Sequence, residues 1–386
     1  MGDPPSSCSR PAPLPIAVAV SISTRIAASR RAPSDLIWVA LLGIPAAMLG
    51  VFTVRAAFAF PDYRDFHIFW SAGRAVVDGT PVYPRAALGS VSKQNLFVYP
   101  APAAVAMVPL ALLPLGASAT IFLALNAAAL MLALRLLGVR DWRCYAIAFC
   151  SIATLQTLTL GAITGFLLLA TACAWRWRDR RSVAAAAVAA VIVAKLFLAP
   201  LLVWLWATGR RSTALAASAI AGGAGLVGWA VVGFASLRDY PHLMSVVSDY
   251  EQRFGYSVAA LTIHLGGGAA VARVLTVLVT AALCVLALVL GRGPEGDRRS
   301  FSVAVVAAIA LSPIVWLNYL LLGLAPLALA RPRLSRAWAL PLLAWLFANP
   351  NTLAPLWKVV LFQVTLAAIL AVAVIGRDQR RSPGTP

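Results

Sequence analysis

The sequence predicts an all-α polytopic membrane protein, and three observations support this fold class. Of the 386 residues, 61% are hydrophobic and 12% are charged, whereas soluble chains carry about 25% charged residues. The mean hydropathy is +0.86. Apolar runs of about 20 residues, the length that crosses a bilayer, recur along the chain. This composition excludes an ordinary soluble enzyme and a disordered chain.

Apolar segments account for most of the chain. Those long enough to cross a bilayer are 36–58, 117–138, 161–177, 213–235, 270–291 and 354–376. Shorter runs, which can cross if they are tilted or packed inside a bundle, are 143–158, 301–317, 318–331 and 337–349. Together with the interrupted stretches, these runs predict about 10–12 transmembrane segments.

Two apolar stretches are interrupted. The stretch 183–208 contains Lys195 and Pro200, so it is either one helix or two half-helices with Lys195 near the outer apex of a hairpin. Residues 98–115 contain several prolines, and we expect them not to cross fully. Broken segments of this kind line cavities in membrane proteins.

Arginine-rich loops predict the orientation of the chain. They lie near 25–31, 135–143, 176–181, 210–211, 292–299, 331–336 and 377–381. The positive-inside rule places them in the cytoplasm. We therefore expect cytoplasmic tails at 1–35 and 377–386 and a single transmembrane domain at 36–376. The net charge of +19 is then mainly topological and does not indicate a nucleic-acid partner.

The first predicted outer loop, 59–97, is unusually rich in acidic residues. Asp62, Asp65 and Asp78 all lie in it. Apolar residues recur at helical spacing from position 65 to 77, which predicts an amphipathic helix at the membrane surface. Asp65 would lie at the N-terminal end of this helix, where backbone N–H groups favour a carboxylate. The alternative is that Asp65 or Asp62 only caps the helix.

Other polar residues gather on the same predicted face. The second outer loop, 236–269, contains Gln252 and Arg253, and residues 312–319 form a further outer turn. Lys195 lies midway along an apolar stretch, where a charge is costly and indicates a functional site. The alternative for Lys195 is that its side chain extends to the interface.

No motif for a metal, nucleotide or other cofactor is present, and we expect none to be needed. The five cysteines match neither a zinc site nor a disulfide framework. The candidate chemistry therefore depends on acidic, basic and aromatic side chains.

Several short motifs, in order along the chain, resemble glycosyltransferase family 87. The first is 65–75 (DFHIFWSAGRA), followed by Asp78-Gly79 and Val82-Tyr83-Pro84. The others are 97–102 (FVYPAP), 109–114 (PLALLP), 158–161 (LTLG), 194–196 (AKL) with Pro200, and 311–316 (LSPIVW) with Tyr319. The resemblance extends from about residue 36 to residue 330.

This resemblance implies a GT-C-like bundle and a polyprenyl-phosphate sugar donor. It implies one inverting displacement that transfers mannose, or as second choice arabinofuranose, to a lipid or glycan acceptor at the outer face of the plasma membrane. Asp65 matches the acid of the first loop and is the candidate general base, with Asp62 in reserve. Lys195 would hold the donor phosphate. Further candidate substrate-binding residues are Arg74, Arg253, Trp70, Tyr83, Gln252, Trp316, Asn318 and Tyr319.

Two other functions stay open. One is a transporter or flippase for lipid-linked glycans, although no repeated halves are evident. The other is a non-catalytic protein that binds glycolipids, because Ala162 and Asn318 stand where many family members carry Gln and His. In every case we expect membrane lipids as partners.

Overall fold

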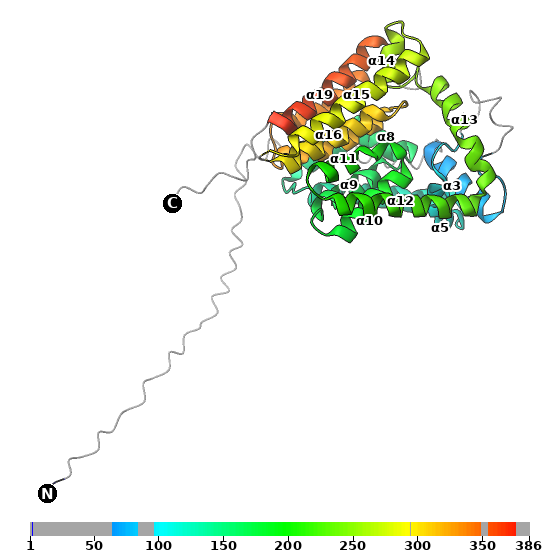
Figure 1. Ribbon diagram of the computed structural model, residues 1–386, viewed down its shortest axis with the longest axis horizontal. Helices are drawn as coiled ribbons and strands as arrows, with labels where there is room; N and C mark the ends of the chain where they lie inside the picture. The colour runs from blue at the N-terminus through cyan, green and yellow to red at the C-terminus, as the bar shows by residue number, and fades with distance from the viewer. Residues whose placement is uncertain (1, 3–63, 84–95, 294, 349–353, 376–386) are drawn as a thin grey trace.

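The computed structural model describes residues 2, 64–83, 96–293, 295–348 and 354–375, and their regular secondary structure is helical throughout (Figure 1). Apart from residue 2, both expected tails lie outside the described residues, as do the predicted span 36–58 and the candidate Asp62.

Among the described residues, four helices are long and apolar enough to cross a membrane. They are α6 (Leu115–Leu136), α12 (Arg211–Val232), α15 (Ala269–Leu290) and α19 (Leu356–Ile375). A fifth candidate is the pair α8 (Ile152–Leu160) and α9 (Thr164–Arg176), bent by 115°. All lie where the sequence predicts apolar spans. The chain is thus an all-α polytopic membrane protein, as predicted.

The shorter predicted runs also form helices. They are α7 (Trp142–Cys150), α16 (Gly296–Leu311), η4 (Leu317–Gly323) with α17 (Leu324–Ala330), and η5 (Arg336–Leu343) with α18 (Ala344–Phe347). α15, α16 and α19 lie side by side (Figure 1). The total of 10–12 transmembrane segments stays a prediction.

The sequence left open whether the stretch around Lys195 is one helix or two half-helices. The structure shows two half-helices. α10 (Arg181–Ala194) ends at Lys195, whose backbone is extended with φ −151° and ψ 112°. A short turn, η3 (Leu196–Leu198), then leads into α11 (Pro200–Ala207). Pro200 has no N–H to continue the α10 hydrogen-bond ladder, but it fits the first turn of a new helix. Lys195 therefore lies at the break.

Residues 98–115 are also interrupted, as predicted. They form α4 (Ala101–Ala106) and α5 (Val108–Ala111), each with a proline in its first turn. A helix of 4 or 6 residues is far shorter than the roughly 20 residues that cross a bilayer. The segment instead packs against α3 and α12.

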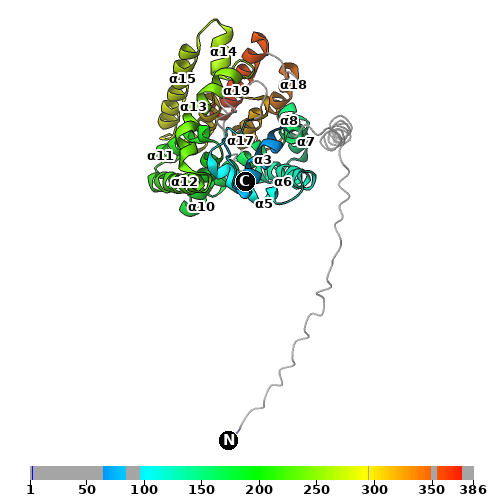
Figure 2. The same cartoon turned by 90° about the vertical axis from the view of Figure 1, so that its right-hand side faces the viewer.

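The predicted amphipathic helix is present as α3 (Arg64–Val77). Its buried residues are Phe66, Phe69, Ala72 and Gly73. α3 packs against α5, α6 and α8 (Figure 2), so protein rather than lipid covers its apolar face. The approach to α5 is close, because a Cβ on Gly73 would lie 2.9 Å from the Cβ of Ala111.

The segment 236–269 lies mainly in α13 (Phe234–Glu251) and α14 (Val258–His264). α13 runs along one edge of the molecule from the end of α12 toward α14 (Figure 1). One side of α13 faces α3 and the break at Lys195 across a cavity.

Candidate active site

A cavity of about 550 Å³ lies between α3, α13, the break at Lys195 and the segment that follows α16. Much of its wall is apolar, with Leu96, Val98, Met244 and Leu311 among the residues that line it. The charged side chains in the wall are Arg64, Asp65, Lys195 and Glu251. A large apolar pocket with a few convergent polar groups is typical of a small-molecule site.

The packing of α3 against its neighbours places Asp65 in this cavity. Its neighbour Phe66 is fully buried, and the Phe66 ring lies 4.8 Å from that of Phe122. The backbone of Phe66 lies against Gly161, which ends α8 in the left-handed conformation at φ +67°. A Cβ at position 161 would come within 2.5 Å of the Phe66 Cβ. Only glycine therefore satisfies both the backbone angle and the contact.

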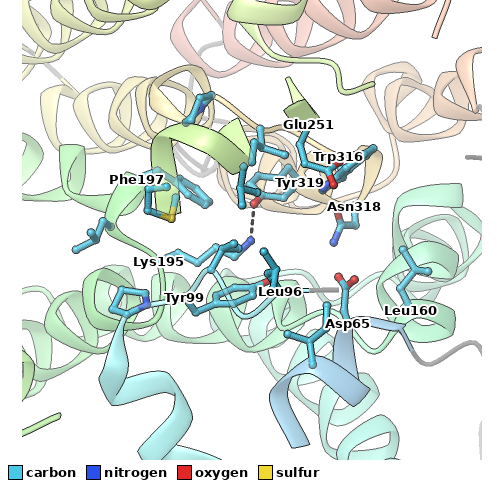
Figure 3. Close-up of a pocket in the computed structure, with 18 of the residues that line it drawn as sticks. Asp65, Leu96, Tyr99, Leu160, Lys195, Phe197, Glu251, Trp316, Asn318 and Tyr319 are labelled. Carbon is cyan, nitrogen blue, oxygen red and sulfur yellow. Dashed lines mark hydrogen bonds between the residues drawn. The ribbon is translucent and has the colours of Figure 1, made fainter. Parts of the chain in front are cut away.

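The Asp65 carboxylate faces the cavity (Figure 3). Within the described part of the chain, it has no hydrogen-bond or ion-pair partner. Burial raises the pKa of Asp65 from 3.8 to about 6, while the charges of Lys195 and Arg64 oppose the rise. A carboxylate with a pKa near working pH is suited to take a proton.

Lys195 extends into the same cavity from the helix break (Figure 3). Its ammonium group donates a hydrogen bond to the Tyr319 hydroxyl. The Nζ atom lies 4.7 Å from the ring centre of Tyr99 and 4.4 Å from that of Tyr319. Aromatic faces stabilise a cation without neutralising it. Since none of the described carboxylates forms an ion pair with Lys195, its charge is available to an anion.

Tyr99 is held in place by two other tyrosines. The Tyr83 hydroxyl donates to the Tyr99 carbonyl at 2.6 Å, and the Tyr240 hydroxyl donates to the Val98 carbonyl at 3.0 Å. The Tyr83 ring stacks on Trp229 at 5.3 Å. Tyr83, a candidate substrate-binding residue from the sequence, thus supports the segment that carries Tyr99 and does not line the cavity.

Trp316, Asn318 and Tyr319, three of the candidate substrate-binding residues, line the cavity. Asn318 is 3% exposed, and its Nδ2 donates to the Thr164 hydroxyl at 3.1 Å. Its Oδ1 is buried and has no hydrogen-bond partner among the described residues. An acceptor atom of this kind is costly unless it receives a hydrogen bond.

The remaining predicted residues lie elsewhere. Arg74 pairs with Asp78 at 2.9 Å on an exposed side of α3. The Trp70 indole donates to the Leu113 carbonyl at 3.2 Å. Gln252 and Arg253 line a second cavity, beside the start of α15. The structure therefore brings together Asp65, Lys195, Trp316, Asn318 and Tyr319. The other candidates do not line this cavity: Arg74, Trp70, Gln252, Arg253 and Tyr83.

Sequence reasoning did not select four polar residues that line the cavity: Arg64, Tyr99, Tyr240 and Glu251. A signal for two of them exists in the sequence. Tyr240, Met244, Val247 and Glu251 follow the helical spacing i, i+4, i+7, i+11, and all four line the cavity. This stripe on α13, hereafter the α13 stripe, forms one wall of the site.

A search of the described ranges finds no group of three or more His, Cys, Asp or Glu residues that could hold a metal ion. That the reaction needs no metal or cofactor stays a prediction.

The sequence model of glycosyltransferase family 87 matches residues 97–317, more than half of the chain. The match covers the break at Lys195 and the α13 stripe. No curated protein and no solved structure matches the chain.

Proposed function

The chain belongs to glycosyltransferase family 87, and we propose that it transfers mannose from a polyprenyl-phosphate donor to a lipid or glycan acceptor. We place the reaction at the outer face of the plasma membrane, with arabinofuranose as the second choice of sugar. Glycosyltransferase activity follows from the family, and membrane-spanning helices follow from the fold. The donor, sugar, acceptor and membrane face are the parts that we propose.

The observation that carries this proposal is an unpaired carboxylate and an available ammonium group in one cavity. In an inverting displacement, the acceptor oxygen forms a bond to the anomeric carbon while the bond from that carbon to the phosphate oxygen breaks. Asp65 would take the acceptor proton. Lys195 would stabilise the second negative charge that develops on the departing phosphate. The electron pair of the broken bond leaves with the phosphate.

The cavity wall supports a lipid-linked donor. Its apolar residues provide a surface for the first isoprene units, whereas Lys195 offers a positive charge for the phosphate. An aqueous nucleotide-sugar donor would instead need contacts to a base and a diphosphate. The family resemblance to polyprenyl-phosphate enzymes favours the same donor.

An assay with radiolabelled polyprenyl-phosphate mannose and membranes that contain the protein tests the proposal. Label that moves into a glycolipid or glycan supports the transferase. Label that crosses the membrane without transfer supports the carrier, and label that only binds supports a glycolipid-binding protein. Comparing the glycolipids of a deletion strain with its parent then identifies the acceptor as the species that accumulates one sugar short.

A further inference from the structure

Glu251 has no part in the mechanism described so far, although it lies in the wall of the cavity. It is the last residue of α13 and the last member of the α13 stripe. It lies across the cavity from Asp65 and beside Trp316 (Figure 3). Within the described ranges, its carboxylate has no hydrogen-bond or ion-pair partner. A partly buried carboxylate without a protein partner suits hydrogen-bond donors from a ligand.

The α13 stripe runs from the phosphate side of the cavity to the acceptor side. At one end, the Tyr240 hydroxyl binds the Val98 carbonyl, next to the Tyr99 ring that lies under Lys195. Glu251 lies 11 residues further along the helix, a rise of about 16 Å. Tyr240 and Glu251 therefore mark the two ends of the wall that the α13 stripe forms.

Glu251 faces the candidate base across the cavity (Figure 3), and the charges of the two carboxylates interact. Burial raises the pKa of Glu251, the Arg64 guanidinium lowers it, and the Asp65 carboxylate raises it. Arg64 is the chain neighbour of Asp65 and lines the same cavity. Glu251, Arg64 and Asp65 thus all line the cavity in which the attacking hydroxyl of the acceptor has to lie.

The chemistry of these groups indicates what the acceptor offers. Asp65 takes the proton of one hydroxyl. A carboxylate can accept several further hydrogen bonds, and a guanidinium supplies donors in a planar fork. An alcohol with a single hydroxyl would leave Glu251 and Arg64 without partners. A ring with neighbouring hydroxyls satisfies all three groups.

We infer that Glu251 is a specificity-determining residue that binds an acceptor hydroxyl next to the one that is glycosylated, so that the acceptor group is a polyhydroxylated ring. This inference rests on the proposed function, because Asp65 marks the acceptor side only if it is the base.

The test compares Glu251→Gln with the wild type, using octyl α-D-mannopyranoside, its monodeoxy analogues and n-octanol as acceptors. The octyl tail is common to all of these probes, so they differ in their hydroxyl groups. We expect the wild type to prefer the mannoside to octanol and to one of the deoxy analogues by about 10- to 100-fold in kcat/KM. In Glu251→Gln, this preference shrinks, the acceptor KM rises and the donor KM is unchanged.

Asp249→Asn is the matched control. Asp249 lies on the same helix, and its carboxylate pairs with Arg273 at 3.3 Å, outside the main cavity. We expect Asp249→Asn to keep the wild-type preference among acceptors. The thermal midpoint of Glu251→Gln should equal that of the wild type or be higher, because burial disfavours its charged carboxylate. That of Asp249→Asn should change little, because its ion pair with Arg273 is exposed.

Three results would overturn the inference: equal transfer to octanol and to the mannoside, a rise in the donor KM alone, or equal loss of rate on every acceptor. If the wild type transfers no sugar to any probe, the proposed function fails. Saturation-transfer NMR of the mannoside with the protein in nanodiscs, without donor, then decides the role of Glu251. Weaker binding in Glu251→Gln supports the inference, and unchanged binding contradicts it.

Discussion

At the scale of single residues, Asp65 and Lys195 are the charged groups on which the proposed transfer depends. Each faces the same cavity without an ion-pair partner among the described residues. Lys195 is held by a tyrosine hydroxyl and aromatic rings. Neutral contacts fix the lysine side chain and leave its charge for the substrate.

The rate of transfer should depend on the protonation of Asp65. A base works in its ionised form, and burial raises the pKa of Asp65 to about 6. We therefore expect kcat/KM to be nearly constant above pH 7 and to fall by about tenfold per pH unit well below pH 6. A pH–rate profile in reconstituted membranes measures this. A profile that stays flat down to pH 4.5 would exclude Asp65 as the base.

Replacing Lys195 by methionine should weaken donor binding. Methionine keeps the apolar stem but removes the charge, so we expect the donor KM to rise by about tenfold or more. Lys358→Met is the control, because Lys358 bonds the Ala348 carbonyl and does not line the cavity. Steady-state kinetics with a labelled donor provides the measurement. An unchanged donor KM in Lys195→Met would reject phosphate binding at this position.

At the scale of elements, the position of α3 depends on the turn between α8 and α9. Gly161 ends α8, and the backbone of Phe66 lies directly against it. Asp65 is the neighbour of Phe66, so the contact between Phe66 and Gly161 fixes the position of α3 and of the candidate base together. The site and the packing of this turn are therefore coupled.

Gly161→Ala should separate the effect of this contact from that of the backbone angle. The added methyl group would meet the Phe66 Cβ, so α3 has to shift and activity should fall by at least tenfold. Gly209→Ala is the matched control, since Gly209 has φ +80° with open space around its Cβ position. Both variants incur the left-handed strain of about 1 kcal/mol. Thermal unfolding and transfer rates measured together give the comparison, and equal losses in the two variants would contradict the coupling.

An element of the fold or a site residue can be predicted from the sequence when the pattern that determines it lies within a few neighbouring residues. The helix of Asp65 follows from apolar spacing, which acts within a few residues. Pro200 indicates an interruption near Lys195 but does not decide between one helix and two half-helices. Glu251 and Tyr99 could not be assigned in this way. Helical spacing shows that the α13 stripe shares one face, but not which segment that face meets. The meeting of α3, α13 and Lys195 depends on contacts between residues distant in the chain.

At the scale of the whole molecule, charged loops and the cavity lie at opposite ends of α16. Arg178, Asp179, Arg210 and Asp297 form a cluster, in which Arg210 contacts Asp179 at 2.8 Å and Asp297 at 2.9 Å. Asp297 is in the first turn of α16, whereas Leu311 at its last turn lines the cavity. These two positions are about 21 Å apart along the helix. The cluster joins three of the loops that we expect in the cytoplasm, and we therefore propose that the cavity lies near the outer face.

Cysteine labelling tests this orientation. In a background that lacks the five native cysteines, Arg253→Cys and Arg180→Cys each introduce one thiol at an exposed position. We expect a membrane-impermeant maleimide to label position 253 in intact cells and position 180 only after permeabilisation. The reverse pattern would place the cavity at the cytoplasmic face.

The most direct test of the central claim is sugar transfer by Asp65→Asn in reconstituted membranes with radiolabelled polyprenyl-phosphate mannose. Loss of a general base lowers rates by about 10²–10⁴-fold, and we expect a loss in this range with normal expression. Because burial disfavours the charged carboxylate, the variant should melt at the same temperature as the wild type or higher at neutral pH. Wild-type turnover in a folded Asp65→Asn protein would contradict the account.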